Sequence, residues 1–197
     1  MAEILDGLSV SQKIKQEIKE EVTKIVQSGK KVPHLAAILV GENGASKAYV
    51  NSKVKDCKEV GFTSSLLKFP DTICENELLE EINKKAIENN KIINGLIEIN
   101  VSKEESKTGI YIEDFKKDSE KYFSMSNVKI AGFMTMAPYE ASQQEINSYF
   151  SNMRELKEEY QKKYNYVTEL SMGMSNDYVE ALKNGATIIR IGSKLFE

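Results

Sequence analysis

The stretch that decides the fold class is Leu35-Ala36-Ala37-Ile38-Leu39-Val40. An unbroken apolar run of this length is typical of a strand that is covered on both faces, as in a parallel sheet. Apolar residues recur at helical spacing between Ser9 and Gly29, where Ser9 with Gln12 fits a capping box and Gly29 suits the end of a helix. A second helical run follows at residues 45–60. The sequence therefore predicts a strand between two helices.

The same alternation continues to the end of the chain. Further strands are predicted at residues 64–69, 95–101, 130–136, 167–172 and 187–192, and further helices at 75–90, 112–122, 143–163 and 177–184. Strands that alternate with helices predict right-handed crossovers between parallel strands. The predicted fold class is α/β, with six mostly parallel strands in an open sheet. A partly closed half-barrel is the alternative, because a complete barrel of this kind needs eight strands.

Composition excludes several classes of function. The chain has 197 residues, is 41% hydrophobic and carries a formal net charge of −3 without a basic patch, so a nucleic-acid partner is not expected. No apolar run approaches the roughly 20 residues that span a bilayer, and the first residues lack the pattern of a signal peptide. One histidine, His34, and two cysteines leave no zinc-binding set, so no metal site is predicted. We expect a soluble, cytoplasmic protein without a membrane partner.

The first part of the chain resembles a folate enzyme family. Residues 1 to about 82 carry Ile4-Leu5-Asp6-Gly7, Val32-Pro33-His34, Ala45-Ser46-Lys47-Ala48-Tyr49-Val50 and Lys53-Val54-Lys55-Asp56-Cys57. These motifs are similar to the bifunctional methylenetetrahydrofolate dehydrogenase/cyclohydrolase family. The resemblance implies that Tyr49 and Lys53 occupy the positions of the family's active-site tyrosine and lysine, on one helical face. A packed rim tyrosine and a solvated lysine are the alternative.

Other parts of that folate site do not follow. The family's Val-Gln-Leu-Pro-Leu-Pro segment would stand after the third strand, where residues 100–104 read differently, and its later aspartate has no match. No G-x-G-x-x-G nucleotide fingerprint occurs. Hydride transfer is therefore not expected, and cyclohydrolase activity would have to arise from an incomplete set of groups.

The second part resembles a different family. From about residue 83 the chain carries Leu96-Ile97-Glu98-Ile99-Asn100-Val101, Glu105-Ser106-Lys107-Thr108-Gly109, Ser171-Met172-Gly173-Met174-Ser175-Asn176-Asp177 and Ile189-Arg190-Ile191-Gly192-Ser193. These motifs resemble the pyridoxal-phosphate homeostasis protein family, whose barrel is related to alanine racemase.

This second resemblance implies a phosphate site in the loops after the last two strands, made by Ser175, Gly192 and Ser193, with Arg190 facing the cofactor's pyridine nitrogen. A helix opening after Ser175 would add attraction for an anion. Glycine at positions 173 and 192 would allow close approach and positive φ. The alternatives are that Ser175 caps its helix and that Arg190 forms an ion pair at the rim.

Together the resemblances imply one architecture. A single domain of residues 1–197 would combine segments 1–82 and 83–197 at a join inside a helix. The sheet order would begin 2-1-3, as in a Rossmann- or flavodoxin-like fold, and continue 4-5-6, with residues 95–101 parallel to residues 35–40. An exposed sheet edge would allow a homodimer.

For function, the sequence favours a recombinant or designed chimera that is not an enzyme, requires no cofactor and keeps only a phosphate-binding loop pair for small anions. One alternative is a module that binds pyridoxal phosphate non-covalently, because no lysine matches the family's cofactor-bound lysine. The other is residual folate-site activity through Tyr49 and Lys53.

Overall fold

The computed structural model describes residues 6–105 and 107–195, apart from the side chain of Ser193. The chain divides into two compact units, Met1–Cys74 and Glu75–Glu197. This division differs from the single domain that the sequence predicted, and it falls shortly before the predicted join near residue 82.

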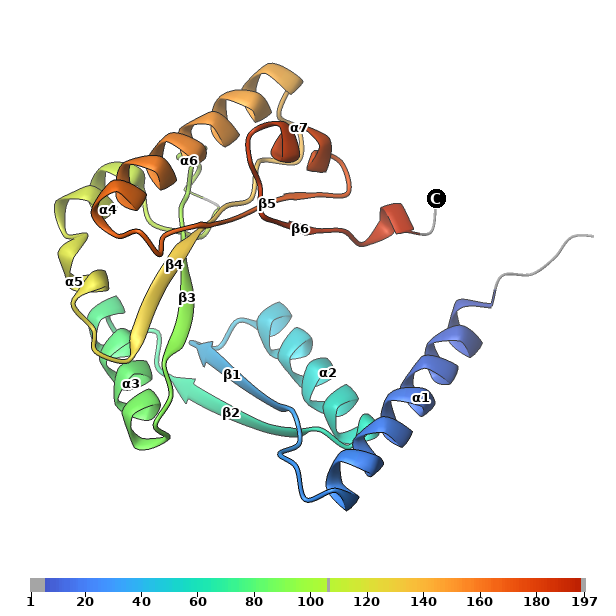
Figure 1. The fold of residues 1–197 in the computed structure, drawn as a ribbon. Helices are drawn as coiled ribbons and strands as arrows, with labels where there is room; N and C mark the ends of the chain where they lie inside the picture. Colours follow the sequence, from blue (N-terminus) through green and yellow to red (C-terminus); the bar gives the residue numbers. More distant parts are fainter. Residues whose placement is uncertain (1–5, 106, 196–197) are drawn as a thin grey trace, which may run out of the picture. The chain divides into compact units, whose positions relative to one another are not determined.

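The first unit contains α1 (Gly7–Gln27), β1 (His34–Val40), α2 (Gly44–Val60) and β2 (Thr63–Phe69). The two strands pair in parallel along their whole length, from His34 opposite Thr63 to Val40 opposite Phe69. α2 runs beside this small sheet, as the crossover connection requires (Figure 1). The predicted strands and helices of this segment are therefore confirmed.

The start of α1 corrects one prediction. The side chain of Asp6 accepts hydrogen bonds from the backbone N–H groups of Leu8 and Ser9, at 3.0 and 3.3 Å. Asp6 is therefore the N-cap, and Ser9 lies inside the helix rather than at its start. Aspartate caps as well as serine does, so the helix begins three residues earlier than predicted. At the other end, Gly29 follows the C-cap with φ of 68°, as its position predicted.

The second unit holds the larger sheet. Its elements are α3 (Glu75–Glu88), β3 (Ile93–Glu98), α4 (Ile112–Lys117), α5 (Glu120–Phe123), β4 (Val128–Met134), α6 (Gln143–Lys163), β5 (Glu169–Met174), α7 (Tyr178–Lys183), β6 (Ile188–Arg190) and a 3-10 turn at Ser193–Leu195. The four strands are parallel in the order β3-β4-β5-β6. The predicted helix at residues 112–122 is two short helices, interrupted at Asp118.

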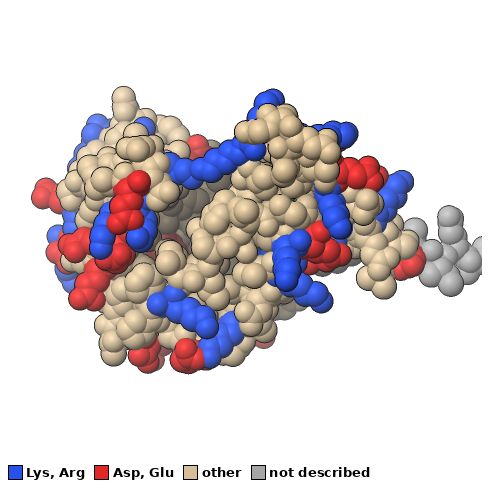
Figure 2. Space-filling view, turned by 90° about the horizontal axis from the view of Figure 1, so that it is seen from below, with Lys and Arg blue, Asp and Glu red and all other residues tan. Residues whose placement is uncertain are grey.

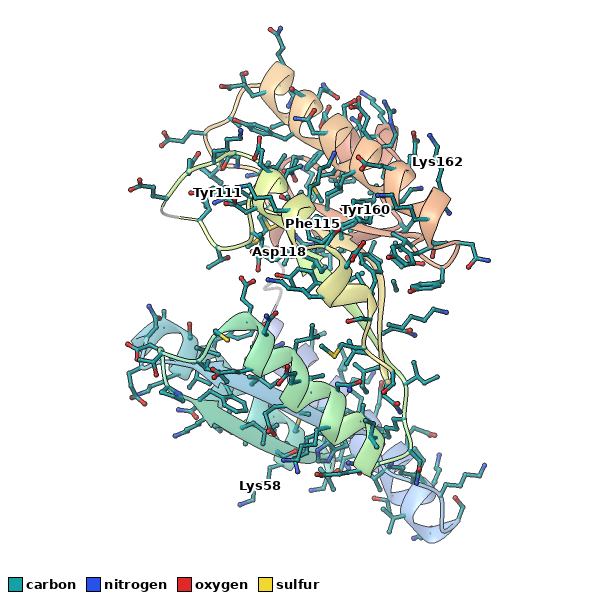
Figure 3. The ribbon with its side chains drawn as sticks, turned by 90° about the vertical axis from the view of Figure 1, so that its left-hand side faces the viewer. Lys58, Tyr111, Phe115, Asp118, Tyr160 and Lys162 are labelled. Carbon is teal, nitrogen blue, oxygen red and sulfur yellow. The ribbon has the colours of Figure 1, made fainter. Side chains whose placement is uncertain are left out.

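An aromatic cluster joins α4 and α6 to the sheet. Phe115 of α4 is fully buried, and its ring centroid lies 5.3 Å from that of Phe133 on β4 and 5.0 Å from that of Tyr160 on α6. Figure 3 shows Phe115 and Tyr160 facing each other between the two helices. The opposite face of β3 leaves Leu96 37% exposed. α4 and α6 therefore pack closely on the face of the sheet that carries Phe133, whereas the other face is partly exposed at Leu96.

The strands belong to two sheets, which corrects the predicted order. β1 and β3 lie in different sheets, so the order 2-1-3 and the pairing of residues 95–101 with 35–40 are wrong. The order 4-5-6 and the α/β class with parallel strands are confirmed. An apolar run shows that a strand is buried, but it does not specify the neighbouring strand. In the described residues the larger sheet is open, with β3 and β6 at its edges.

Two surface findings bear on function. No helix in the described part of the chain is long and apolar enough to cross a membrane. On the face in Figure 2, lysine and arginine side chains are interspersed with aspartate and glutamate. That face therefore presents no continuous basic surface.

Candidate functional site

The loops that follow β5 and β6 meet at Ser175. This residue comes directly after β5, and its hydroxyl accepts hydrogen bonds from the backbone N–H groups of Gly192, at 3.2 Å, and Lys194, at 3.3 Å. Both donors follow β6. The structure therefore brings Ser175 and Gly192 together, and it adds the N–H group of Lys194, which no sequence motif pointed to.

The two glycines of these loops have different roles. Gly173 has φ of 92°, and a Cβ atom there would lie 2.5 Å from the Cβ of Ala181 and 3.0 Å from the Cα of Tyr178. Gly173 thus allows α7 to pack against the end of β5. Gly192 has no positive φ, and a Cβ there would meet nothing within 4 Å. The expected need for a positive φ is confirmed at Gly173 and wrong at Gly192.

The helix after Ser175 begins later than predicted. α7 starts at Tyr178 and has only six residues, with Asp177 as its N-cap residue. The buried carboxylate of Asp177 accepts a hydrogen bond from the backbone N–H of Met174 at 2.6 Å. A negative side chain thus already stands at the start of this short helix. The expected attraction of an anion by the helix dipole is correspondingly small.

Arg190 lies at the end of β6 and reaches across the carboxyl ends of its neighbours. Its Nη1 donates to the hydroxyl of Ser171 at 2.6 Å and to the carbonyl of Ser171 at 3.1 Å, and its Nη2 donates to the carbonyl of Thr135 at 3.0 Å. β4, β5 and β6 are thereby linked at the same edge as the two loops. The expected ion pair at the rim is not what holds Arg190.

Ser193 is placed only in part. Its backbone opens the 3-10 turn Ser193–Leu195, between the two N–H groups that reach Ser175. Its hydroxyl, the predicted contact to phosphate, lies outside the described atoms. That role stays a prediction.

The predicted folate residues lie in the first unit. Tyr49 is 66% exposed on α2, and the Nζ of Lys53 lies 5.4 Å from the centroid of its ring. The expectation that they share one helical face is confirmed. His34 bridges to the neighbouring strand, with its ring nitrogens 2.8 Å from the hydroxyl of Thr63 and 2.7 Å from that of Ser65.

Sequence reasoning missed two residues at the carboxyl edge of the larger sheet. Ser171 is buried on β5, and Thr135 directly follows β4 with its hydroxyl bonded to the carbonyl of Ile99 at 2.8 Å. A serine between the apolar residues Leu170 and Met172 was the available signal for Ser171. Nothing in the sequence pattern singled out the carbonyl of Thr135.

The geometry defines a class of protein, a parallel α/β chain in which polar loops converge at the carboxyl edge of neighbouring strands. Residues 66–197 match the family described as the alanine racemase N-terminal domain. This match covers more than half of the chain, so the chain belongs to that family. Residues 5–99 match the catalytic domain of tetrahydrofolate dehydrogenase/cyclohydrolase. The resemblance to two families is therefore confirmed, and the two matches share residues 66–99.

Named relatives are of the same two kinds. The chain is 44% identical over 120 residues to a pyridoxal phosphate homeostasis protein of Aquifex aeolicus, covering 60% of this chain and 53% of that protein. It is 56% identical over 94 residues to the bifunctional protein FolD of Christiangramia forsetii, covering 48% of this chain and 31% of that protein. The chain thus spans about half the length of the first relative and about a third of the second.

Solved structures support the fold. The structure of PipY from Synechococcus elongatus without PLP has a TM-score of 0.61 at 23% identity, covering 91% of this chain and all of that one. The same protein with PLP bound has a TM-score of 0.59 at 22% identity, with the same coverage. At this identity the likeness concerns the fold alone.

These comparisons correct two expectations about function. Both parts of the chain have natural relatives, which overturns the interpretation as a recombinant or designed protein without evolved activity. The expectation that the chain is not an enzyme is also wrong, because its first part matches an enzyme's catalytic domain and is 56–58% identical to FolD proteins.

Proposed function

We propose that this chain binds pyridoxal phosphate non-covalently, through the loops that follow β5 and β6. The observation that carries the proposal is the convergence of the Gly192 and Lys194 N–H groups on the hydroxyl of Ser175. The relative from Aquifex aeolicus is named for pyridoxal phosphate, and PipY has been solved with PLP bound. The family match over residues 66–197 covers the segment that carries this convergence.

The donors fit a phosphate group. At 3.2 and 3.3 Å, their bonds to the neutral hydroxyl of Ser175 are at the long end of the usual range. A charged phosphate oxygen is a stronger acceptor, so these N–H groups gain by turning toward it while the hydroxyl donates to a second oxygen. A few such contacts at an exposed site correspond to a dissociation constant in the millimolar range, or about −4 kcal/mol. Small anions such as phosphate and sulfate should compete.

Pyridoxal phosphate would bring an aldehyde and an electron-accepting ring to this edge. The residues of this chain would then have two roles. Ser175 would hold the phosphate, and Arg190 would face the ring. Covalent capture needs a partly deprotonated amine held beside the aldehyde, and no lysine here matches the family's lysine. We therefore propose reversible binding, and the cytoplasm remains the expected compartment.

Ligand-dependent thermal unfolding tests this function. Pyridoxal phosphate and inorganic phosphate should raise the melting temperature, whereas pyridoxal, which lacks the phosphate, should not. Ser175→Ala should remove the effect, and the matched control Ser124→Ala, at an exposed serine of the same unit, should keep it. Equal stabilisation by pyridoxal would contradict a site built for phosphate.

Borohydride reduction followed by peptide mapping tests the non-covalent part. Little labelling, spread over several lysines, is expected at low ligand concentration. Stoichiometric labelling of one lysine, Lys53 above all, would show covalent capture instead.

The match of residues 5–99 supports a second candidate, folate-type chemistry at Tyr49 and Lys53. A lysine whose Nζ lies near an exposed tyrosine ring can exchange a proton with a ligand stacked on that ring. A folate analogue should then raise the melting temperature of the wild type but not that of Lys53→Met. Lys58→Met, which changes another lysine of α2, is the control.

A further inference from the structure

The hydrogen bonds of Arg190 are concentrated on one residue. Within the described residues the guanidinium makes three hydrogen bonds, of which two go to Ser171, and the bond to the Ser171 hydroxyl is the shortest at 2.6 Å. Ser171 is only 4% exposed, so water does not compete for this hydroxyl. The side chain of Ser171 is therefore a fixed acceptor for Arg190.

The carbonyl groups at this edge are shared, whereas the hydroxyl is not. The carbonyl of Ser171 also accepts the backbone N–H of Thr135 at 3.1 Å, as part of the contact between β4 and β5. The carbonyl of Thr135 is fixed by the same backbone. These two acceptors remain whatever side chain stands at position 171, so the hydroxyl is the part that a substitution can remove by itself.

The guanidinium keeps donors for another group. It has five N–H groups, and the three contacts involve only Nη1 and Nη2. Within the described residues, Nε–H and one N–H of Nη2 have no acceptor. Their direction is set by the plane of the guanidinium, and that plane is set by the contacts to Ser171 and Thr135.

We propose that Ser171 is a positioning residue that fixes the guanidinium plane of Arg190, so that its remaining N–H groups are presented to an acceptor atom on the ring of a phosphate ester bound at Ser175. This inference rests on the proposed function. It means that the preference of the site for ligands with a ring depends on the buried hydroxyl of Ser171, which itself touches no ligand. Phosphate alone makes no use of the guanidinium plane. Ser171 should therefore affect ring-bearing ligands only.

The test compares Ser171→Ala and Ser171→Thr with the wild type, using pyridoxine 5′-phosphate and inorganic phosphate as probes. Pyridoxine 5′-phosphate has the ring and the phosphate but lacks the aldehyde, so lysines cannot capture it. Ser171→Ala should lose about 5- to 10-fold in affinity for this probe, the usual effect of one hydrogen bond, and change its affinity for phosphate by less than about twofold. Ser171→Thr keeps a hydroxyl and should restore most of the loss.

Each outcome decides something. A wild type that binds neither probe overturns the proposed function, and this inference with it. A wild type that binds both, with an unchanged ratio of the two affinities in Ser171→Ala, overturns the inference alone. Equal weakening for both probes, not restored by Ser171→Thr, would show that Ser171 only supports the fold. Nitrogen NMR signals of the Arg190 guanidinium provide a ligand-free check, because its N–H exchange should speed up in Ser171→Ala and not in Ser171→Thr.

Discussion

Gly173 and Gly192 lie at the ends of neighbouring strands, but only Gly173 has a positive φ and close neighbours that require a glycine. Replacing Gly173 with alanine places a methyl group against Ala181 at a residue whose φ is 92°. Strain and overpacking together should lower the free energy of unfolding by about 2–4 kcal/mol. Gly192→Ala meets no atom within 4 Å and should change it by less than about 0.5 kcal/mol. Urea unfolding of both variants is the measurement, and equal losses would contradict this difference.

The hydroxyl of Ser175 is expected to be the polar centre of the site. Ser175→Ala leaves the N–H groups of Gly192 and Lys194 without their protein acceptor and removes a donor to phosphate. Affinity for inorganic phosphate should fall about 5- to 30-fold, as for one or two hydrogen bonds to a charged group. Calorimetric titration measures this loss. A Ser175→Ala variant with the affinity of the wild type would place the anion elsewhere.

For single residues, the sequence predicted which residues lie close together better than it predicted which atoms they contact. Ser175 and Gly192 follow two strands that were predicted as neighbours, so their proximity followed from the order of a parallel sheet. The partners of Arg190 could not be predicted in the same way. The register between β5 and β6 shifts between Ser171 and Met174, and Thr135, whose carbonyl accepts from Arg190, follows the end of a third strand.

Among the elements, α6 has a capping box that makes stability depend on pH. The carboxylate of Glu145 accepts two hydrogen bonds from Ser142, one from the hydroxyl at 2.7 Å and one from the backbone N–H at 2.8 Å. These bonds hold the pKa of Glu145 below its ordinary value. Because the pKa of Glu145 is lower in the folded than in the unfolded chain, its ionised carboxylate stabilises the fold at pH values above the pKa of the unfolded chain. This stabilisation is lost as the pH falls through the pKa of the folded chain.

Glu145→Ala should therefore be less stable than the wild type near neutral pH, and the difference should shrink as the solution is acidified through the range in which Glu145 takes up its proton. Chemical unfolding at a series of pH values measures it. Glu158→Ala removes a carboxylate from the same helix away from its N-terminus and serves as the control. A difference that grows on acidification would have the wrong sign for this cap.

The packing of α4 on the sheet depends on one ring. Phe115 contacts the rings of Phe133 and Tyr160 and has no exposed surface. Phe115→Ala should cost about 3–5 kcal/mol of unfolding free energy, since it removes buried area and leaves a cavity. Tyr139→Ala, at an 84% exposed aromatic residue of the same unit, should cost less than about 0.5 kcal/mol. Similar costs for both would mean that the aromatic cluster is not the core.

The elements themselves were largely predictable, because helical and strand periodicity are local properties of the sequence. Their ends were less so: α1 begins at Gly7 rather than after Ser9, since Asp6 supplies the cap. The helix predicted at residues 112–122 breaks at Asp118, although its apolar pattern continues to Tyr122.

For the whole molecule, the sequence predicted the α/β class and the parallel strands but not their division between two sheets. The resemblance to the folate enzyme family implied that β1 lies beside β3, whereas the two strands lie in different sheets. Apolar patterns do not encode which strands pair, so the sequence offered no independent check. β3 and β6 are the edge strands of the larger sheet, so a homodimer through a sheet edge stays a prediction, which sedimentation at several concentrations would test.

We propose that the loops after β5 and β6 bind the phosphate of a pyridoxal-type ligand. The most direct test is an NMR titration of the full chain with pyridoxal phosphate that follows the backbone amide signals of Ser175, Gly192 and Lys194. All three signals should move together and saturate with one dissociation constant, around the millimolar range. Inorganic phosphate should move the same signals. If they stay fixed while the ligand is bound, or at saturating phosphate, the claim is contradicted.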